Sequence, residues 1–205
     1  MWRPAERISD GTRHLAVPLG RVVAKTGVPP NLLTIFGFLM NVGVAWIISR
    51  GPDYFLIAGG LIVVAGIFDL LDGAVARITN RVTKFGALLD STLDRLSDAV
   101  LLFGLLWYYA WQQNASTETI LIFAAIVGSL LVSYVRARAE GLGLDCEVGI
   151  MRRTIRILTL AIALMLSTFE PLLLVALWGL AVSSNLTAAH RLIYVWYKSS
   201  KRPPS

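Results

Sequence analysis

Six long apolar stretches, separated by short polar turns, dominate this chain of 205 residues. A helix needs about 20 apolar residues to cross the hydrocarbon core of a bilayer. Hydrophobic residues make up 56% of the chain and charged residues only 16%, whereas a soluble domain carries about 25% charged residues. We therefore predict an all-α integral membrane protein with six transmembrane helices. The predicted helices cover residues 32–49, 54–79, 84–111, 119–140, 152–168 and 172–197.

The segment before the first predicted span, residues 1–30, has the pattern of an amphipathic helix that lies in the membrane interface. The apolar face consists of Leu15, Leu19, Val22 and Val23, and the basic residues among the polar positions are Arg13, Arg21 and Lys25. An ordinary solvated basic tail is the alternative. We predict an interfacial segment over residues 1–30, a six-helix domain over 31–198 and a cytoplasmic tail over 199–205.

The basic residues are distributed unevenly between the two ends of the predicted helices. Of the 19 Lys and Arg residues, Arg50 alone lies in the turns that follow the first, third and fifth spans. The positive-inside rule assigns the opposite side, with both termini, to the cytoplasm. We thus expect a multi-pass protein of the cell membrane. The net charge of +6 then reflects topology, and no nucleic-acid partner is needed to explain it.

Four acidic residues interrupt the apolar pattern near one predicted turn. Asp69 and Asp72 are three residues apart on the second span, and Asp90 and Asp94 are four residues apart on the third, so each pair shares a helical face. A short turn makes the two helices antiparallel neighbours. Carboxylates that converge at a membrane surface repel one another unless cations neutralise them. Oxygen ligands suit Mg²⁺ or Mn²⁺, and four acids are enough for two ions, an arrangement used in phosphoryl chemistry.

Two glycines and an arginine accompany these acids. Gly73 and Gly86 allow a nucleotide or diphosphate to approach the backbone closely. Arg77, one turn after Gly73, carries a planar donor group that suits a phosphate. A network of helix salt bridges is the structural alternative, but only Arg77 and Arg95 oppose the four acids nearby. The residues therefore favour a diphosphate site at the cytoplasmic surface of the membrane.

The spacing D-x2-D-G-x2-A-R-x8-G-x3-D-x3-D over residues 69–94 resembles the signature of the CDP-alcohol phosphatidyltransferases. The resemblance covers nearly the whole chain, because that family has six spans and an N-terminal interfacial helix. It also implies a homodimer. Membership would make the chain a transferase of phospholipid biosynthesis.

The resemblance implies a role for each residue of the motif. Asp69, Asp72 and Asp90 would hold the metals together with Asp94, which would also be the general base for the acceptor hydroxyl. The resulting alkoxide would attack the β-phosphorus of CDP-diacylglycerol and expel CMP. The residues that would bind the CDP-lipid are Asn31, Thr34, Asp69, Gly73, Arg77 and Gly86. Asn31 and Thr34 match a Pro-Asn-x-x-Thr pattern of the family, and helix capping, with Asn31 as N-cap, is their alternative role.

Arginines outside the motif point to an acceptor that itself carries a phosphate. Five arginines lie in residues 136–156, and Arg191 lies within the last span, where an arginine usually has an anionic partner. We predict an acceptor-phosphate site made of Ser133, Arg136, Arg153, Arg156 and Arg191. The run over residues 133–140 resembles the bacterial phosphatidylinositol phosphate synthase branch of the family, which implies inositol 1-phosphate. Arg152 stands where that branch usually has glutamate, so glycerol 3-phosphate stays open as the acceptor.

Two functions of other classes are compatible with parts of the pattern. A divalent-cation transporter also carries intramembrane acids, but its site tends to lie at the bilayer midplane on broken helices. Here the acids lie near a cytoplasmic turn, and Arg77 among them would repel a cation in transit. A non-catalytic lipid-binding protein would leave Asp94 unexplained beside an already sufficient set of metal ligands. We therefore favour the enzyme.

Overall fold

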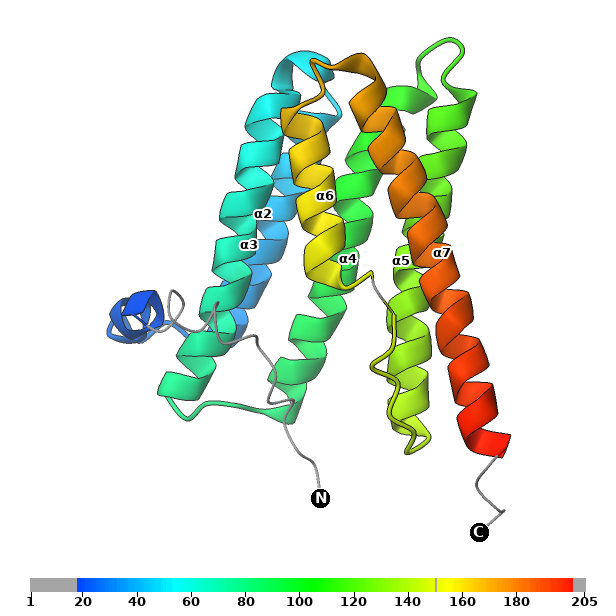
Figure 1. The fold of residues 1–205 in the computed structure, drawn as a ribbon. Helices are drawn as coiled ribbons and strands as arrows, with labels where there is room; N and C mark the ends of the chain where they lie inside the picture. The colour runs from blue at the N-terminus through cyan, green and yellow to red at the C-terminus, as the bar shows by residue number, and fades with distance from the viewer. Residues whose placement is uncertain (1–17, 150, 201–205) are drawn as a thin grey trace. The chain divides into compact units, whose positions relative to one another are not determined.

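The computed structural model describes residues 18–149 and 151–200, and every regular element within them is helical (Figure 1). The helices are α2 (Pro30–Ile48), α3 (Phe55–Ile78), α4 (Lys84–Ala110), α5 (Ser116–Gly141), α6 (Arg153–Met165) and α7 (Glu170–Ser200), with the 3-10 turn η1 (Pro52–Tyr54) before α3. Residues 18–24 are also helical. The described part of the chain contains no strand, so the prediction of an all-α fold is confirmed for these residues.

The six long helices fall in the six predicted apolar stretches. Most ends agree to within a few residues, but α6 is shorter than predicted, with 13 residues in place of 152–168. Helix α7 continues to Ser200, two residues into the predicted tail, and residues 201–205 lie outside the described part. The predicted interfacial segment is described only from residue 18 onward, so Arg13 and Leu15 lie outside the described residues.

Four of the described helical segments are long and apolar enough to cross a membrane. They are Pro30–Ile48, Pro52–Ile78, Ser116–Gly141 and Pro171–Ser200. The other two predicted spans differ from these for separate reasons. Helix α6, at about 1.5 Å per residue, is shorter than the bilayer core of about 30 Å. Helix α4 has 27 residues, but Asp90, Asp94, Arg95 and Asp98 precede its apolar C-terminal part.

The chain divides into two compact units whose boundaries cut through α2, α3 and α4. The first unit comprises Met1–Met40 and Val64–Leu93, and the second comprises Asn41–Val63 and Asp94–Ser205. The three helices continue without interruption through these boundaries. The first unit therefore holds the beginning of α2, the end of α3 and the beginning of α4.

The second unit has an apolar core to which most of its helices contribute. Its largest fully buried side chains include Phe55, Ile62, Leu105, Leu164 and Leu177, from α3, α4, α6 and α7. Burial of such side chains is the main favourable term in folding and in helix packing around a common core. The core thus fixes the helices that carry Asp94, Asp98 and the arginines of α6.

Large apolar side chains also cover the outside of the second unit. Trp46, Phe103, Phe123, Trp178 and Trp196 are all at least half exposed. A soluble protein rarely exposes apolar surface of this extent, because water solvates it poorly. Lipid tails solvate the same side chains well, so this surface agrees with insertion in a bilayer.

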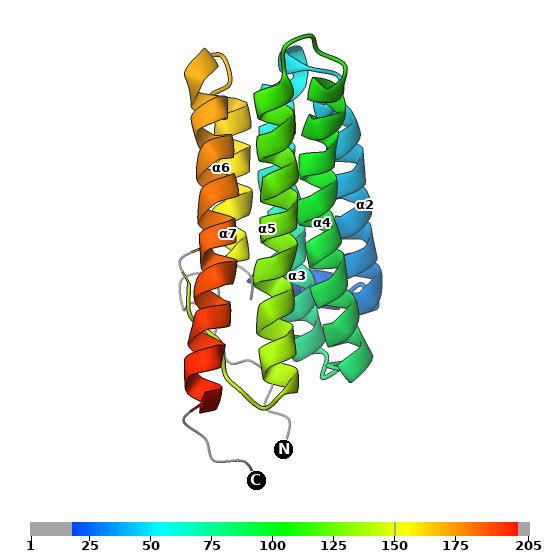
Figure 2. The ribbon, with the colours of Figure 1, turned by 90° about the vertical axis from the view of Figure 1, so that its right-hand side faces the viewer.

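Helices α5 and α7 lie side by side in both views of the ribbon (Figures 1 and 2). Gly128 on α5 makes this close approach possible, because a Cβ there would lie 2.9 Å from Cβ of Ser184 on α7. Asn185 adds a polar contact, since its side-chain amide donates to the carbonyl oxygen of Ala124 at 2.9 Å. Small residues and interhelical hydrogen bonds of this kind drive helix association in membranes.

We expect Gly104→Ala to destabilise the protein. A Cβ at Gly104 would lie 2.3 Å from the carbonyl oxygen of Ala45, so α4 and α2 would have to move apart. Overpacking of this kind costs about 1–3 kcal/mol, which corresponds to a fall of roughly 2–12 °C in Tm for a protein of this size. Gly43→Ala is the matched control, because a Cβ there would meet nothing within 4 Å. Thermal unfolding in detergent measures both variants, and equal Tm values would contradict the packing described.

Candidate active site

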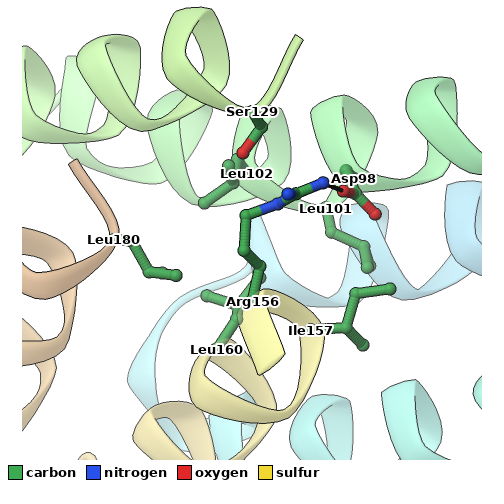
Figure 3. Close-up of a pocket in the computed structure, with 8 residues that line it drawn as sticks. All are labelled: Asp98, Leu101, Leu102, Ser129, Arg156, Ile157, Leu160 and Leu180. Carbon is green, nitrogen blue, oxygen red and sulfur yellow. Dashed lines mark hydrogen bonds and ion pairs between the residues drawn. The ribbon is translucent and has the colours of Figure 1, made fainter. Parts of the chain in front are cut away.

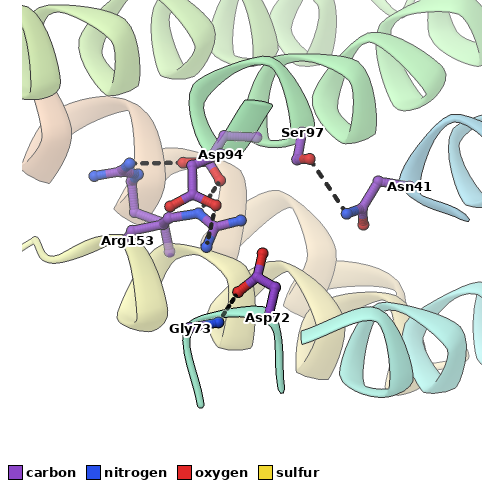
Figure 4. A network of polar contacts seen from close by, with 8 residues as sticks. Asn41, Asp72, Gly73, Asp94, Ser97 and Arg153 are labelled. Atoms are coloured by element: carbon purple, nitrogen blue, oxygen red, sulfur yellow. Dashed lines mark hydrogen bonds and ion pairs between the residues drawn. The ribbon is translucent and has the colours of Figure 1, made fainter. Parts of the chain in front are cut away.

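Three acidic residues of the predicted motif lie in the first unit. Asp69 and Asp72 lie near the end of α3, and Asp90 lies in the first half of α4. The carboxylate of Asp72 is buried, and one of its oxygens, Oδ1, accepts a hydrogen bond from the backbone N–H of Gly73 (Figure 4). The other oxygen, Oδ2, is buried without a hydrogen-bond partner. The negative charges of Asp90 and Asp69 both act on Asp72, so the three carboxylates form one acidic cluster.

The first turns of α2 face this cluster. A Cβ at Gly37 would lie 3.1 Å from Oδ1 of Asp69, so the missing side chain leaves room for that carboxylate. The hydroxyl group of Thr34 lies next to Asp72 and donates to the carbonyl oxygen of Pro30 at 3.2 Å. Thr34 therefore belongs to the surroundings of the acids, and its predicted contact with the nucleotide stays a prediction.

Asn31 lies close to the start of α4 and does not cap α2. Helix α2 begins at Pro30, because proline suits the first helical position. Asn31 is therefore the second residue of the helix, and the prediction that it is the N-cap was wrong. A Cβ at Gly86 would lie 3.0 Å from Oδ1 of Asn31. Thr83 supplies the cap of α4 instead, since its Oγ1 accepts from the backbone N–H of Gly86 at 2.9 Å.

Arg77 extends over Gly73. A Cβ at Gly73 would lie 3.5 Å from Nη1 of Arg77, in ordinary van der Waals contact, so the guanidinium group lies directly beside this glycine. Arg77 is exposed in the last turn of α3, where it can donate to an anion from outside. The residues predicted to bind the CDP-lipid thus all belong to the first unit. They are Asn31, Thr34, Asp69, Gly73, Arg77 and Gly86.

The second unit begins on α4 at Asp94, one turn after Asp90, and contains a chain of ion pairs. Arg153, the first residue of α6, donates from Nη1 to Oδ1 of Asp94 at 2.9 Å (Figure 4). Its Nε lies 3.3 Å from Oδ1 of Asp98. Arg156 reaches the other oxygen of Asp98, with Nη2 at 2.6 Å from Oδ2 (Figure 3). Two acids of α4 and two arginines of α6 are therefore joined in a row.

Arg156 is largely enclosed by protein. It is 6% exposed, its Nη1 donates to the carbonyl oxygen of Met151 at 3.1 Å, and its Nε is buried without a partner. A small cavity, lined among others by Ser129 and Leu180, lies beside the side chain (Figure 3). Its volume of about 10 Å³ holds about one water molecule. The cavity is thus too small for a substrate.

Arg191 is equally buried but is held by backbone groups. Its Nε donates to the carbonyl oxygen of Val148 at 2.8 Å, and its Nη1 donates to that of Val132 at 2.6 Å. It therefore ties α7 to α5 and to the segment between α5 and α6. The charges of Arg136 and Arg156 both act on Arg191, so the three guanidinium groups lie within electrostatic reach of one another.

The other two residues of the predicted acceptor site lie on α5. Arg136 is partly exposed, and its Nε pairs with Oε1 of Glu140 at 2.8 Å. Ser133 is partly buried and follows Val132, whose carbonyl oxygen binds Arg191. All five residues predicted to bind the acceptor phosphate belong to the second unit.

The ion pairs of α4 with α6 were not predicted. Only Arg77 and Arg95 were counted as cations that oppose the acids, because they are close along the chain. Arg153 and Arg156 are 55 and 58 residues away from Asp98 in sequence, and no local pattern signals such a pairing. The sequence does show that Asp98 continues the acidic row of α4 by one more turn, but it does not show which cations pair with it.

The acidic cluster of the first unit has the donor atoms that a divalent cation needs. Within residues 18–149 and 151–200, no three His, Cys, Asp or Glu side chains are already arranged as ligands of one ion. Oδ2 of Asp72 is nevertheless a buried oxygen without a partner, and two further carboxylates act on the same group. Buried charges of one sign require a cation or protons. The residues present therefore fit a hard divalent ion with oxygen ligands.

Comparisons with known proteins agree with this arrangement. The profile of the CDP-alcohol phosphatidyltransferase family matches residues 28–188. The phosphatidylinositol phosphate synthase of Mycobacterium tuberculosis is 36% identical over 189 residues, which cover 89% of this chain and 86% of that protein. The archaetidylinositol phosphate synthase of Methanothermobacter thermautotrophicus is 38% identical over 180 residues, covering 86% of this chain and 88% of the relative.

Solved structures of the M. tuberculosis enzyme have the same fold. The complex with manganese and citrate has a TM-score of 0.82 at 34% identity and covers 88% of each chain. The structure with CDP-DAG bound has a TM-score of 0.81 at 33% identity and covers 89% of this chain and 94% of that one. The family resemblance of the motif over residues 69–94 is confirmed, and the chain belongs to the CDP-alcohol phosphatidyltransferase family as a phosphotransferase of phospholipid biosynthesis.

Proposed function

We propose that this enzyme transfers the phosphatidyl group of CDP-diacylglycerol to inositol 1-phosphate and releases CMP. The observation that carries this proposal is the ion pair between Arg153 and Asp94. It joins the proposed general base directly to an arginine of the proposed acceptor-phosphate site. The M. tuberculosis and M. thermautotrophicus relatives are named phosphatidylinositol phosphate synthase and archaetidylinositol phosphate synthase, and these names support the choice of acceptor.

The proposed binding site for the CDP-lipid consists of residues of the first unit together with Asp94. Asp69, Asp72, Asp90 and Asp94 would hold two divalent ions, Mg²⁺ or Mn²⁺; the manganese in a related structure supports this. When bound, the ions would neutralise the diphosphate of the CDP-lipid. Gly73 and Gly86 leave room for that diphosphate beside the backbone, and Arg77 would donate to a phosphate oxygen. Asn31 and Thr34 would border the nucleotide.

Asp94 would act as the general base. Its carboxylate accepts the proton of the acceptor hydroxyl, and the acceptor oxygen forms a bond to the β-phosphorus. The bond from that phosphorus to the bridging oxygen breaks, and CMP leaves with the bridging oxygen. The proton then passes from Asp94 to water. Arg153 is only partly buried, with 28% of its side chain exposed, so an acceptor phosphate can reach it and replace Asp94 as its anionic partner.

The proposed acceptor site surrounds Arg153 with further cations. Arg136 is also open to solvent and would contact the phosphate, whereas Arg156 and Arg191 would attract it from buried positions. Ser133 would donate a hydroxyl hydrogen bond. Glycerol 3-phosphate is the second candidate acceptor, because Arg152 stands where the inositol-phosphate branch usually has glutamate.

The proposed topology has six spans in the cell membrane with both termini in the cytoplasm. Helices α4 and α6 would be the two further spans beside the four helices that are long and apolar enough to cross a membrane. The basic residues gather at the ends that carry the acids, which supports a cytoplasmic active site. Residues 1–30 would lie in the interface before the six-helix domain of residues 31–198, with residues 199–205 as a tail. A homodimer is proposed from the family resemblance alone.

We expect Asp94→Asn to lower kcat by about 10²–10⁴-fold, the usual contribution of a general base. The amide keeps the shape of the side chain but cannot accept the proton. The measurement is CMP release from CDP-diacylglycerol with Mn²⁺ and inositol 1-phosphate. Asp53→Asn, the same exchange at an exposed position of η1, is the control and should keep full activity. Retained turnover in the Asp94 variant would exclude it as the base.

The acceptor is identified by offering four alcohols separately to the wild-type enzyme. We expect CMP release with inositol 1-phosphate, and less or none with glycerol 3-phosphate, free inositol or serine. The arginines of the second unit require an anionic acceptor, so activity with free inositol or serine alone would contradict the proposed site. Activity with glycerol 3-phosphate alone would replace inositol 1-phosphate by the second candidate.

Removal of divalent ions should abolish transfer. We expect a chelator such as EDTA to reduce CMP release to background, and excess Mn²⁺ or Mg²⁺ to restore it, because the acidic cluster cannot bind a diphosphate while its carboxylates are uncompensated. Ca²⁺ serves as a comparison, since it prefers more ligands at longer distances. Full activity in EDTA would show that the cluster has another role.

A further inference from the structure

Asp98 pairs with two arginines of the second unit, yet neither the motif over residues 69–94 nor the proposed chemistry uses it. It lies on α4 one turn after Asp94 and is 6% exposed. Each of its oxygens meets a different arginine: Oδ1 meets Nε of Arg153, and Oδ2 meets Nη2 of Arg156. One buried carboxylate thus holds two of the five residues proposed to bind the acceptor phosphate, and Figure 3 shows its contact with Arg156.

The contact with Nε determines how Arg153 presents its guanidinium group. The group is planar, so fixing Nε and one terminal nitrogen fixes the direction of every donor. In this structure Nε faces Asp98 while Nη1 faces Asp94. Without Asp98, Arg153 would lose the contact at Nε that, together with the contact of Nη1 with Asp94, fixes the plane of its guanidinium group.

The contact between Asp98 and Nη2 of Arg156 keeps this second arginine away from the acceptor instead of presenting it. Met151 and Asp98 occupy both terminal nitrogens of this arginine. Arg156 is thereby kept in the protein interior, where its charge balances that of Asp98. A buried carboxylate with a single arginine at 3.3 Å would be poorly compensated, so the second arginine makes the burial of Asp98 possible.

We propose that Asp98 is a positioning residue for the phosphorylated acceptor, acting through Arg153. This inference rests on the proposed function, since it assumes that Arg153 binds the acceptor phosphate. Asp98 fixes the guanidinium of Arg153 before the acceptor arrives, so that binding does not have to order this side chain. The effect of Asp98 on binding should therefore differ between the two substrates. Affinity for the acceptor depends on Asp98, whereas affinity for CDP-diacylglycerol, whose proposed ligands lie in the first unit apart from Asp94, does not.

A purely structural ion pair between α4 and α6 makes a different prediction. Its loss would lower the stability of the whole protein and would change the KM values of both substrates alike, or neither. The two roles are therefore separated by the ratio of the two KM effects, measured on folded protein.

The test is Asp98→Asn, with KM determined separately for each substrate. We expect KM for inositol 1-phosphate to rise about tenfold, the loss of one charge-assisted hydrogen bond that orients Arg153. KM for CDP-diacylglycerol should stay within about twofold. Inorganic phosphate, used as a competitive inhibitor against the acceptor, should lose affinity by a similar factor. An unchanged KM for the acceptor, or an equal rise for both substrates, would overturn the proposal.

Ser97→Ala is the matched control. Ser97 is the buried neighbour of Asp98 on α4, and its hydroxyl oxygen accepts from the side-chain amide of Asn41 at 3.3 Å (Figure 4). Its removal breaks a buried polar contact between helices without touching an arginine. Both KM values should therefore stay within about twofold of the wild-type values.

Asp98→Glu covers the case in which Asp98→Asn does not fold. Glutamate keeps the negative charge that pairs with Arg153 and Arg156 but displaces the carboxylate by one carbon–carbon bond. We expect a smaller rise, about threefold, in KM for the acceptor alone; an unchanged value would then overturn the proposal. Wild-type activity is read in parallel. An enzyme that uses no phosphorylated acceptor refutes the proposed function itself, whereas an active enzyme with unchanged variant KM values refutes only the role of Asp98.

Discussion

The compensation of buried negative charge on α4 is the constraint on which the rest of the structure depends. Asp90, Asp94 and Asp98 follow one another at intervals of one turn on a helix whose second half is apolar. A carboxylate removed from water needs a partner or loses its charge. Asp94 and Asp98 obtain arginines from α6, whereas Asp90 belongs to the acidic cluster that includes Asp72. One row of acids is thus compensated in two different ways.

These two kinds of compensation correspond to the two substrates of the proposed reaction. The acidic cluster of the first unit leaves a buried oxygen of Asp72 without a partner, as suits a metal that binds a diphosphate. The acids of the second unit already have cationic partners, and one of these, Arg153, is open to solvent. Asp94 would belong to both proposed sites. It follows the proposed metal ligand Asp90 on α4, and it contacts Arg153 of the proposed acceptor-phosphate site.

The sequence was sufficient for features that depend on local patterns. The apolar stretches predicted all six long helices, and the spacing of Asp69 to Asp94 predicted the family. The sequence was insufficient for features that depend on contacts between residues distant along the chain. Arg153 and Arg156 meet Asp98 across more than 50 residues, so counting neighbours along the chain underestimated the cations around the acids. The length of α6 was overestimated, because the helix ends at Met165 and the predicted residues 166–168 lie in the turn that follows it.

The four arginines of the proposed acceptor-phosphate site differ in what balances their charge. Three carboxylates, those of Glu140, Asp94 and Asp98, pair with Arg136, Arg153 and Arg156. Arg191 instead donates to the carbonyl oxygens of Val148 and Val132, and a carbonyl dipole does not cancel a full charge. The cluster therefore keeps a net positive charge, located on a buried side chain near Arg136 and Arg156. This charge attracts the phosphate of an acceptor and so strengthens its binding, whereas it does not strengthen the binding of a neutral polyol. The field of Arg191 itself therefore favours a phosphorylated acceptor.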